Sequence, residues 1–391
     1  MTLAKLLSIP SSERAARGLT HMPGEIAQQP LTWLDTLRRI QALEPRLAPK
    51  LRGALRALSR PQVLLLGAGT SDFVGRSVAH LLRSRWRCPV EVVPTTDFAT
   101  HEQNLLVDGV PYVSVSFSRS GRSPESVHAL HYMLERTPGM PQLIVTCDRD
   151  GAMARELSAH PNAVTLLLDD SVNDRGLAMT SSYTNLVVAG LALAHWNDLA
   201  RFEELLHAVA AAWKRLAVVA DVLAEQLAQR QFSKICFLGS GALNGVARES
   251  ALKVLELTAG RASSSAESFL GLRHGPLSAL DAKTLVVGLM SSEARVRRYE
   301  LDVLREIRLK RLAAETVVIA QNPEPRLRDV STYLLNVDVP HQVADDHLAP
   351  VMVLFGQLLG LHCSLAHGLK PDAPSPDGVI HRVVSGVEMH A

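Results

Sequence analysis

Three serines and a glycine follow directly on an apolar run in the first half of the chain. Residues 112–117 are largely apolar and predict a strand, and Ser118, Ser120, Gly121 and Ser123 come immediately after it. Hydroxyl groups and the main-chain N–H groups of a turn that opens a helix are hydrogen-bond donors, and together they match the oxygens of a phosphate group. The spacing therefore predicts a phosphate-binding loop between a strand and a helix, residues 118–123, which we call the serine loop.

The same loop also has the features of a helix start. Ser123 followed by Pro124 is typical of an N-cap residue with proline at the first helical position. Arg119 and Arg122 could add positive charge beside a bound anion. The alternative interpretation is a serine-rich turn that only caps its helix, and the loop taken alone leaves both interpretations open.

A second group of ionisable side chains has helical spacing. Glu249, Lys253 and Glu256 fall on one face of a helix that is predicted to contain residues 246–258. Such a set is often an exposed row of ion pairs. The apolar residues beside it, Leu252 among them, favour the boundary of a buried face instead. A carboxylate held there beside an ammonium group can exchange protons near neutral pH.

One histidine stands in a charged setting farther along the chain. Glu267, Arg273 and His274 lie within the short stretch 267–276, and His274 precedes a Gly-Pro pair. A histidine before Gly-Pro can simply be part of a turn. The acid and the base close to it in sequence favour a functional role.

Composition restricts the classes of function. The 391 residues are 47% hydrophobic and carry a formal net charge of +2, from 41 basic and 39 acidic side chains that are mixed along the chain. This mixture argues against nucleic-acid binding and against a membrane-surface helix. The apolar runs fall below the roughly 20 residues of a membrane helix, and the first residues do not resemble a signal peptide. The four cysteines show no metal-ligand spacing, so we expect reduced thiols, no bound metal and a location in the cytoplasm. We also expect the protein to act on small molecules and to need no cofactor.

Short apolar runs alternate with helix-length segments, which is typical of a parallel sheet covered by helices. In the first half of the chain, the runs that predict strands are residues 63–66, 90–93, 112–117 and 143–146. The first of them ends in a glycine-containing loop, predicted from Gly67 to Gly75, before a helix begins.

A similar order of elements returns farther along the chain. Residues 235–238 lead into a loop predicted from Gly239 to Gly245, and the offset between the two loops is 239 − 67 = 172. Later predicted strands correspond in the same way: Phe117 with Met290, and Leu143 with Val317. The sequence therefore predicts the same architecture twice. The counterpart of the serine loop, residues 291–293, has no glycine and contains an acid, so we expect phosphate binding in the first copy only.

Three further helices are predicted from the spacing of apolar residues: 33–58, 202–227 as a linker between the copies, and 349–367 as a buried helix. Pro45 and Pro49 are expected to break the first of these. Residues 1–20 have no clear period, and residues 370–377 predict an extended, proline-rich tail.

On this duplicated framework, four motifs resemble those of the sugar isomerase (SIS) domain proteins: Gly67-Ala-Gly-Thr-Ser71, Ser118-Arg-Ser-Gly-Arg-Ser123, Ala251-Leu-Lys-Val-Leu-Glu256 and Arg273-His-Gly-Pro276. Further stretches resemble the branch of that family named for tagatose-6-phosphate ketose/aldose isomerase or galactosamine-6-phosphate deaminase/isomerase. These are Glu25-Ile-Ala-Gln-Gln-Pro-Leu-Thr-Trp33, Glu267-Ser-Phe-Leu-Gly-Leu-Arg-His-Gly-Pro276 and the tail that begins Lys370-Pro-Asp.

The resemblance implies an α/β fold with two tandem SIS domains, each a flavodoxin-like parallel sheet with helices on both faces. The implied parts are an N-terminal helical arm (1–44), a first SIS domain with the serine loop (45–205), a second SIS domain with the Glu/His catalytic segment (206–366) and a C-terminal tail (367–391). Family members are usually dimers or tetramers with sites near subunit contacts, so the resemblance also implies a homo-oligomer.

The resemblance further implies a reaction. The substrate would be a hexosamine or hexose 6-phosphate, and the reaction the conversion of galactosamine 6-phosphate to tagatose 6-phosphate and ammonia. By similarity to the isomerase domain of glucosamine-6-phosphate synthase, Glu256 would shuttle the proton, His274 would open the ring and Lys253 would support the open-chain intermediate. The residues implied to bind the substrate are Thr70, Ser71, Ser118, Ser120, Ser123, Glu267 and Arg273.

The sequence departs from the synthase in two ways. The tail lysine of the synthase has no clear equal here, where His381 and Arg382 stand nearby, and the glutamine-hydrolysing domain is absent from this sequence. An amino sugar would then be deaminated with water.

Three alternatives are open to different degrees. One is a plain ketose/aldose 6-phosphate isomerase. Another is a non-catalytic regulator that binds sugar phosphate, which the presence of Glu256 and His274 disfavours. The last is a dinucleotide-dependent dehydrogenase, which is disfavoured because Asp72 stands at the third glycine position of the fingerprint.

Overall fold

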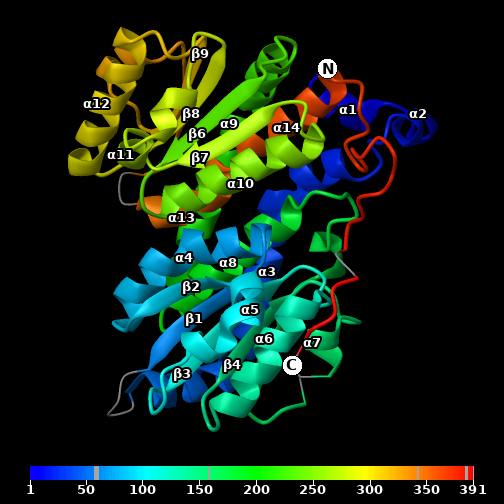
Figure 1. The fold of residues 1–391 in the computed structure, drawn as a ribbon, viewed down its shortest axis with the longest axis vertical. Helices are drawn as coiled ribbons and strands as arrows, with labels where there is room; N and C mark the ends of the chain where they lie inside the picture. The colour runs from blue at the N-terminus through cyan, green and yellow to red at the C-terminus, as the bar shows by residue number, and fades with distance from the viewer. Residues whose placement is uncertain (57–60, 157–158, 341–342, 384–385, 391) are drawn as a thin grey trace. The chain divides into compact units, whose positions relative to one another are not determined.

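The structure, a computed structural model, describes residues 1–56, 61–156, 159–340, 343–383 and 386–390. Figure 1 shows that each of its two compact units is built on a sheet flanked by helices. Unit 1 comprises Met1–Pro30, Arg175–Thr180 and Leu205–Ile380, and unit 2 comprises Leu31–Asp174, Ser181–Glu204 and His381–Ala391. The domain boundaries at residues 44, 205 and 366 stay predictions.

Unit 2 contains the sheet of the first half of the chain. Its strand order is β2-β1-β3-β4-β5, and all neighbouring strands run parallel. The strands are β1 (Gln62–Gly67), β2 (Val90–Pro94), β3 (Tyr112–Ser118), β4 (Gln142–Thr146) and β5 (Ala163–Leu167). The helices between and after them are α4 (Thr70–Trp86), α5 (Thr95–Leu105), α6 (Pro124–Arg136), α7 (Ala152–Arg155), the 3-10 turn η1 (Asp170–Val172) and α8 (Ser181–Ala194).

Unit 1 contains the second sheet, with the order β10-β9-β8-β6-β7 and parallel pairing throughout. The strands are β6 (Lys234–Gly239), β7 (Ser263–Glu267), β8 (Thr284–Met290), β9 (Glu315–Gln321) and β10 (Tyr333–Val337). The helices are α1 (Leu3–Ser8), α2 (Ser11–Ala16), α10 (Ala242–Leu257), α11 (Phe269–Leu272), η2 (Pro276–Ala279), α12 (Ala294–Leu309), η3 (Pro325–Val330), α13 (Asp345–Met352) and α14 (Leu354–Ala366).

The two sheets have the same topology. In each, the first strand of the copy lies between the second and the third, and the fourth and fifth follow in order, which is the flavodoxin-like arrangement. The strands predicted at residues 63–66, 112–117, 143–146 and 235–238 are all confirmed. Every residue of β3 and of β8 is buried, as expected for parallel strands that helices cover on both faces.

The long helix α3 (Met22–Arg56) differs from its prediction, and its predicted end at Leu58 lies outside the described residues. It begins before residue 33 and continues through Pro45 and Pro49, so the expected breaks are wrong. Proline costs about 3 kcal/mol inside a helix. Apolar side chains on one stripe, such as Trp33 and Leu51, are completely buried, and their burial offsets that cost.

The predicted starts of two other helices are wrong. Helices α4 and α10 begin at Thr70 and Ala242, inside the segments predicted as loops, because small and polar residues suit the first turn of a helix. The linker helix predicted over 202–227 is confirmed as α9 (Leu199–Ala228).

The buried helix predicted over 349–367 starts earlier and is divided at Val353 into α13 and α14. Pro350 has no N–H to donate, and at the division the bond from Val353 N to Ala349 O is stretched to 3.4 Å. Among the described residues, the stretch Asp345–Ala366 is the one helical segment that is long and apolar enough to cross a membrane. It is buried inside unit 1, as the core helix of a globular domain is.

Candidate functional site

The serine loop lies at the point of the first sheet where the strand order reverses. Strands β1 and β3 are neighbours, with Leu66 of β1 beside Ser116 of β3, so the loops that follow both strands leave the same edge of the sheet. Ligands of open parallel sheets bind at this position, outside the carboxyl ends of the strands. Thr70 and Ser71 follow β1 and are buried in the first turn of α4, while Ser118 ends β3. The fold thus brings the two predicted serine segments to one edge.

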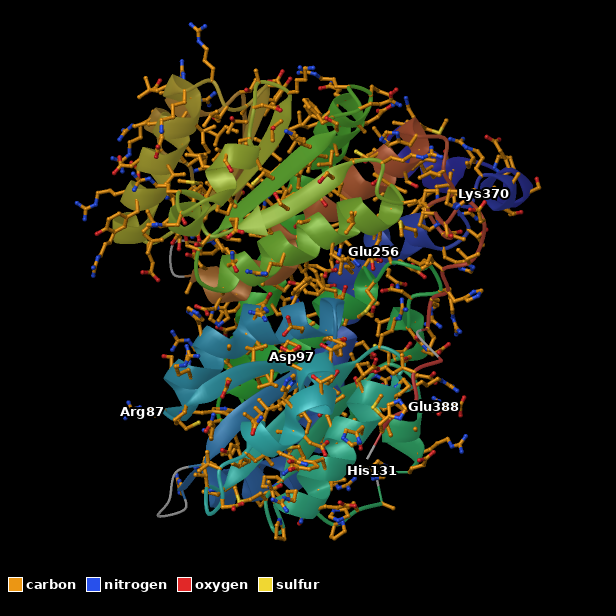
Figure 2. All side chains as sticks on the ribbon, viewed as in Figure 1. Arg87, Asp97, His131, Glu256, Lys370 and Glu388 are labelled. Atoms are coloured by element: carbon orange, nitrogen blue, oxygen red, sulfur yellow. The ribbon has the colours of Figure 1, made fainter. Side chains whose placement is uncertain are left out.

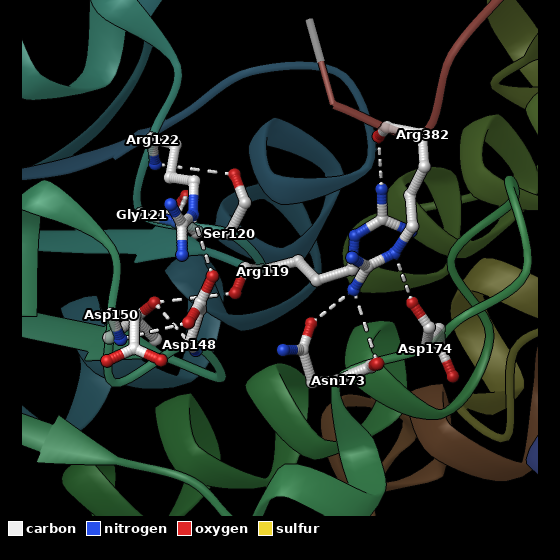
Figure 3. Close-up of polar contacts among 11 residues, drawn as sticks. Arg119, Ser120, Gly121, Arg122, Asp148, Asp150, Asn173, Asp174 and Arg382 are labelled. Carbon is white, nitrogen blue, oxygen red and sulfur yellow. Dashed lines mark hydrogen bonds and ion pairs between the residues drawn. The ribbon is translucent and has the colours of Figure 1, made fainter.

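The hydroxyls of the loop organise its own main chain, as Figure 3 shows for Ser120 and Arg122. Ser118 Oγ accepts a hydrogen bond from Gly121 N (2.9 Å), and Ser120 Oγ accepts one from Arg122 N (3.3 Å). A hydroxyl that accepts one bond keeps its proton for donation. Ser118 and Ser120 can therefore shape the turn and still donate to an anion.

Ser123 is the N-cap residue of α6 and Pro124 is the first residue of the helix, as predicted, but the side chain of Ser123 does not cap the helix. The Ser123 hydroxyl makes no capping bond to the helix and donates to Ser126 Oγ instead (2.7 Å). Gly121 has a φ of +58°, a conformation that favours glycine, and a side chain there would approach Thr146 Oγ1 to 3.2 Å. The turn therefore depends on glycine at this position.

One of the two loop arginines is paired with a carboxylate. Arg122 Nε donates to Asp148 Oδ2 at 2.9 Å, from the loop to the segment after β4. Burial acts to raise the pKa of the Asp148 carboxyl, but the hydrogen bond and charge of Arg122 outweigh it and lower the pKa. Asp148 is therefore ionised at neutral pH, and it takes up part of the positive charge predicted for phosphate binding.

In unit 1, the row of charges on α10 is buried, and the interpretation as an exposed ladder is wrong. Lys253 Nζ lies 2.6 Å from Glu256 Oε2 and 3.3 Å from Glu249 Oε1. The side chains of Lys253 and Glu249 are 0% exposed and that of Glu256 is 28% exposed. Glu256, labelled in Figure 2, is therefore the member of the group that solvent or a substrate can reach.

Helix α14 seals this group because two of its glycines allow it to approach α10 closely. A Cβ on Gly356 would lie 2.4 Å from Ser250 Cβ, and one on Gly360 would lie 3.1 Å from the Lys253 carbonyl oxygen. Burial acts to lower the pKa of Lys253, but the attraction and hydrogen bonds of Glu249 and Glu256 outweigh it and raise the pKa. The group therefore holds a permanent ammonium ion between two carboxylates, a combination suited to moving protons at Glu256.

The histidine segment, residues 267–276, follows from the end of β7 in unit 1. Glu267 ends β7, and α11 follows at once, capped by Ser268 Oγ, which accepts from Gly271 N (3.0 Å). His274 is exposed in the turn after α11. Arg273 is also exposed and forms an ion pair with Glu306 of α12 (2.9 Å). The roles predicted for these residues stay predictions.

Three candidate functional residues, Glu249, Asp148 and Arg382, were not among the site residues predicted from the sequence. Glu249 was noticed through its helical spacing, but only the fold shows that it is buried. Asp148 follows β4 at the same edge as the serine loop, and a polar residue after a parallel strand is the signal that could have found it. Arg382, noticed only for its place in the tail, contacts the serine loop (Figure 3).

The free cysteines Cys88, Cys147, Cys236 and Cys363 are all buried, as predicted. Within the described ranges, no group of three His, Cys, Asp or Glu side chains is placed to hold a metal ion. Independence of metal stays a prediction.

Comparison with known proteins gives a consistent result. The family model described as the SIS domain matches residues 58–196. The D-galactosamine-6-phosphate deaminase AgaS of Escherichia coli is 36% identical over 370 residues, which are 94% of each chain. The crystal structure of the tagatose-6-phosphate ketose/aldose isomerase of Escherichia coli superposes with a TM-score of 0.85 at 33% identity, over 95% of this chain and 96% of that one. A candidate enzyme of the same name from Clostridium novyi NT gives a TM-score of 0.94 at 29% identity, over 100% and 99% of the two chains.

Proposed function

The chain belongs to the sugar isomerase (SIS) domain family, in the branch of the AgaS proteins, and we propose that it converts galactosamine 6-phosphate and water to tagatose 6-phosphate and ammonia. The single observation that carries the proposal is the group on α10. Lys253 is completely buried between Glu249 and Glu256, and Glu256 alone of the three is partly exposed. A chain that only bound a sugar phosphate would have no use for such a costly buried ion.

The reaction needs one proton carrier close to two adjacent carbons. In the open-chain amino sugar, Glu256 removes the proton from C2 and the aldehyde oxygen O1 takes up a proton, so that an enolamine forms between C1 and C2. The same carboxylic acid then returns its proton to C1, and the nitrogen gives up one proton, which balances the proton gained by O1 and leaves an imine at C2. Water adds to C2 and ammonia departs, giving the ketose. The Lys253 ammonium lies beside the Glu256 carboxylate, where it can stabilise negative charge on the intermediate.

The serine loop is the proposed site for the 6-phosphate. Ser118, Ser120 and Ser123 surround the turn before α6, and Thr70 and Ser71 open α4 at the same edge of the sheet. Hydrogen bonds to a charged acceptor are worth more than neutral ones, so several hydroxyls suffice to anchor a dianion. We assign ring opening to His274 and contacts with the sugar to Glu267 and Arg273.

We further propose a cytoplasmic homo-oligomer, a dimer or a tetramer. The four buried free thiols are compatible with a reducing compartment.

The test is incubation of the purified protein with galactosamine 6-phosphate, with ammonia and ketose assayed separately. One ammonia released per ketose formed is the expected result. Galactose 6-phosphate, glucosamine 6-phosphate and tagatose 6-phosphate serve as comparison substrates. Rapid interconversion of galactose 6-phosphate and tagatose 6-phosphate without ammonia would make the protein a plain isomerase, the activity in the name of the Escherichia coli structure with a TM-score of 0.85. Binding without any turnover would make it a regulator.

A further inference from the structure

Within unit 2, the side chain of Arg382 holds the C-terminal tail to the residues just before α8 (Figure 3). Its Nε donates to the carbonyl oxygen of Asp174 at 2.5 Å. Its Nη2 donates to the carbonyl oxygen of Asn173 at 3.2 Å and also to Asn173 Oδ1. The planar guanidinium group thus uses its fork to hold two consecutive residues, which an ammonium group cannot do in the same geometry.

The residues that receive Arg382 are themselves fixed. The carboxylate of Asp174 accepts hydrogen bonds from Ser181 N (3.1 Å) and Ser182 N (2.8 Å), the first main-chain amides of α8. It also accepts one from Ser182 Oγ (2.5 Å). Helix α8 is buried along its whole length, so Arg382 is anchored to a rigid part of the unit.

The tail in turn holds the serine loop. Arg119 Nη2 donates to the main-chain carbonyl oxygen of Arg382 at 2.5 Å. The main-chain oxygen of Arg119 accepts from Cys147 N (3.2 Å) and from Thr146 Oγ1 (3.4 Å), at the end of β4. Arg119 is only 8% exposed. Its main chain is therefore fixed by the sheet and its side chain by the tail.

Charged groups of both signs surround the loop. Three guanidinium groups, from Arg119, Arg122 and Arg382, stand on or against it. The nearby carboxylates are those of Asp148, paired with Arg122, of Asp174, held by the start of α8, and of Asp150, whose charge also acts on Arg122. The N–H groups of the three guanidinium groups are hydrogen-bond donors that suit a phosphate dianion.

We propose that Arg382 is a positioning residue for phosphate recognition: it fixes the tail so that the tail carbonyl holds the Arg119 guanidinium, and with it the serine loop, in the arrangement that binds the phosphate group. The inference rests on the proposed phosphate role of the loop. Because linkage is reciprocal, a bound phosphate should also hold the tail in place.

The first experiment measures binding of inorganic phosphate by calorimetry and the kinetics with galactosamine 6-phosphate. Arg382→Ala is expected to weaken phosphate binding by about tenfold, which corresponds to the loss of a charge-assisted contact. KM should rise with it while kcat changes little, because Arg382 does not touch the reacting carbons. Arg382→Lys is expected to restore only part of the affinity, and full restoration would overturn the positioning role.

The matched control is Arg83→Ala. Arg83 lies in the same unit and also donates from its guanidinium group to a main-chain carbonyl, that of Val90 (2.7 Å), on an element away from the serine loop. Phosphate affinity is expected to be unchanged in this variant. An equal loss in both variants would show a general effect on folding and overturn the inference.

The second experiment uses the unmodified protein. Between residues 371 and 391, Arg382 is the one site for trypsin, and Pro371 protects the bond after Lys370. Release of the peptide 383–391 therefore reports whether the tail is docked. Saturating phosphate is expected to slow this release relative to chloride at equal ionic strength.

The outcomes separate the two claims. If phosphate binds the parent protein but neither slows the cleavage nor depends on Arg382, the positioning role is wrong while the proposed function stands. If the parent binds no phosphate, the role of the serine loop fails as well.

Discussion

The β3–α6 loop of unit 2 and the β8–α12 loop of unit 1 follow corresponding strands of two sheets with the same strand order. They differ in whether a carboxylate of the chain itself binds the hydrogen-bond donors of the loop. In unit 2, the loop carries hydroxyls and arginines. In unit 1, the carboxylate of Asp345 accepts from Ser291 Oγ (2.5 Å) and from Ser292 N (2.7 Å). A carboxylate of the chain itself thus occupies the donors that a phosphate would need.

A second carboxylate, that of Glu300, binds a main-chain amide of the same loop of unit 1. Glu300 of α12 is buried and accepts from Ser291 N at 2.9 Å, while Arg297 Nε donates to the Ser291 carbonyl oxygen at 2.7 Å. Burial, together with the charge of the nearby Asp345, raises the pKa of Glu300 to about 7, against the hydrogen bonds from Ser240 and Ser291 and the charge of Arg297. The comparison teaches that one fold can keep or lose an anion site through two carboxylates, without any change in its strands.

The helices after the first strand of each copy also differ, but here unit 1 has the buried charges. On α4 of unit 2, Asp72 forms an ion pair with Arg76, whose side chain is partly exposed. On α10 of unit 1, Lys253 and Glu249 are completely buried and Glu256 is partly so. We therefore propose that unit 2 binds the phosphate and unit 1 carries the proton transfer.

The largest expected effect tests this division of roles. Glu256→Gln should lower kcat by about 10² to 10⁴-fold, the usual cost of losing an acid–base group, while binding of the sugar phosphate is retained. Exchange of the C2 hydrogen with deuterated water is the direct measurement. Asp302→Asn, which alters an exposed ion pair of unit 1 with Arg305, is the control. Parent-like exchange in Glu256→Gln would make Glu256 structural.

The next effect tests whether Asp345 is an internal substitute for an anion. Asp345→Ala leaves the hydroxyl of Ser291 and the amide of Ser292 without their acceptor. We expect the free energy of unfolding in urea to fall by about 2 to 4 kcal/mol. Sulfate should recover part of this loss, because an anion that binds only the folded state stabilises it. An unchanged midpoint would refute the comparison between the two loops.

A smaller effect concerns pH. The folded-state pKa of Glu300, about 7, lies above its ordinary value of 4.5, so the folded protein keeps a proton that the unfolded chain releases. The stability that this group contributes is fully present below about pH 4.5, and it is lost as pH rises through about 7, by on the order of 3 kcal/mol. Thermal unfolding from pH 5 to 8 should show a shallower decline in Glu300→Gln than in the parent. Equal slopes of stability against pH in the two proteins would contradict the raised pKa of Glu300.

The smallest effect comes from matched serine variants in the two loops. Ser118→Ala should weaken binding of the sugar phosphate by about tenfold. Ser291→Ala, at the corresponding position, should lower the unfolding free energy by about 1 to 2 kcal/mol and leave KM unchanged. Affinity and denaturation are measured on both variants. An equal effect of both on KM would mean that the second loop also binds substrate.

Much of the fold could be predicted because apolar runs that end at glycine or serine mark parallel strands well. The runs before Gly67, Ser118 and Gly239 are all strands, and the offset between the copies correctly located β8 and β9. The expected breaks at Pro45 and Pro49 were wrong because local proline rules do not include the packing that holds α3 together.

Within the site, the sequence by itself determined which residues could do the chemistry: the hydroxyls of the serine loop, and Lys253 with Glu256 at helical spacing. It could not decide whether the charges on α10 face water. That depends on α14, distant in the sequence, whose glycines allow the close approach that buries Lys253.

The tertiary structure also decided which of the two corresponding loops keeps its donors for an anion. The sequence showed an acid in the second loop, Glu293, but the carboxylates that bind the donors of the loop are those of Glu300, on the helix directly after it, and of Asp345, on a helix farther along the chain. A hydrogen bond between residues as far apart in sequence as Ser291 and Asp345 depends on how the helices pack on the sheet, and no local pattern of residue types records that packing.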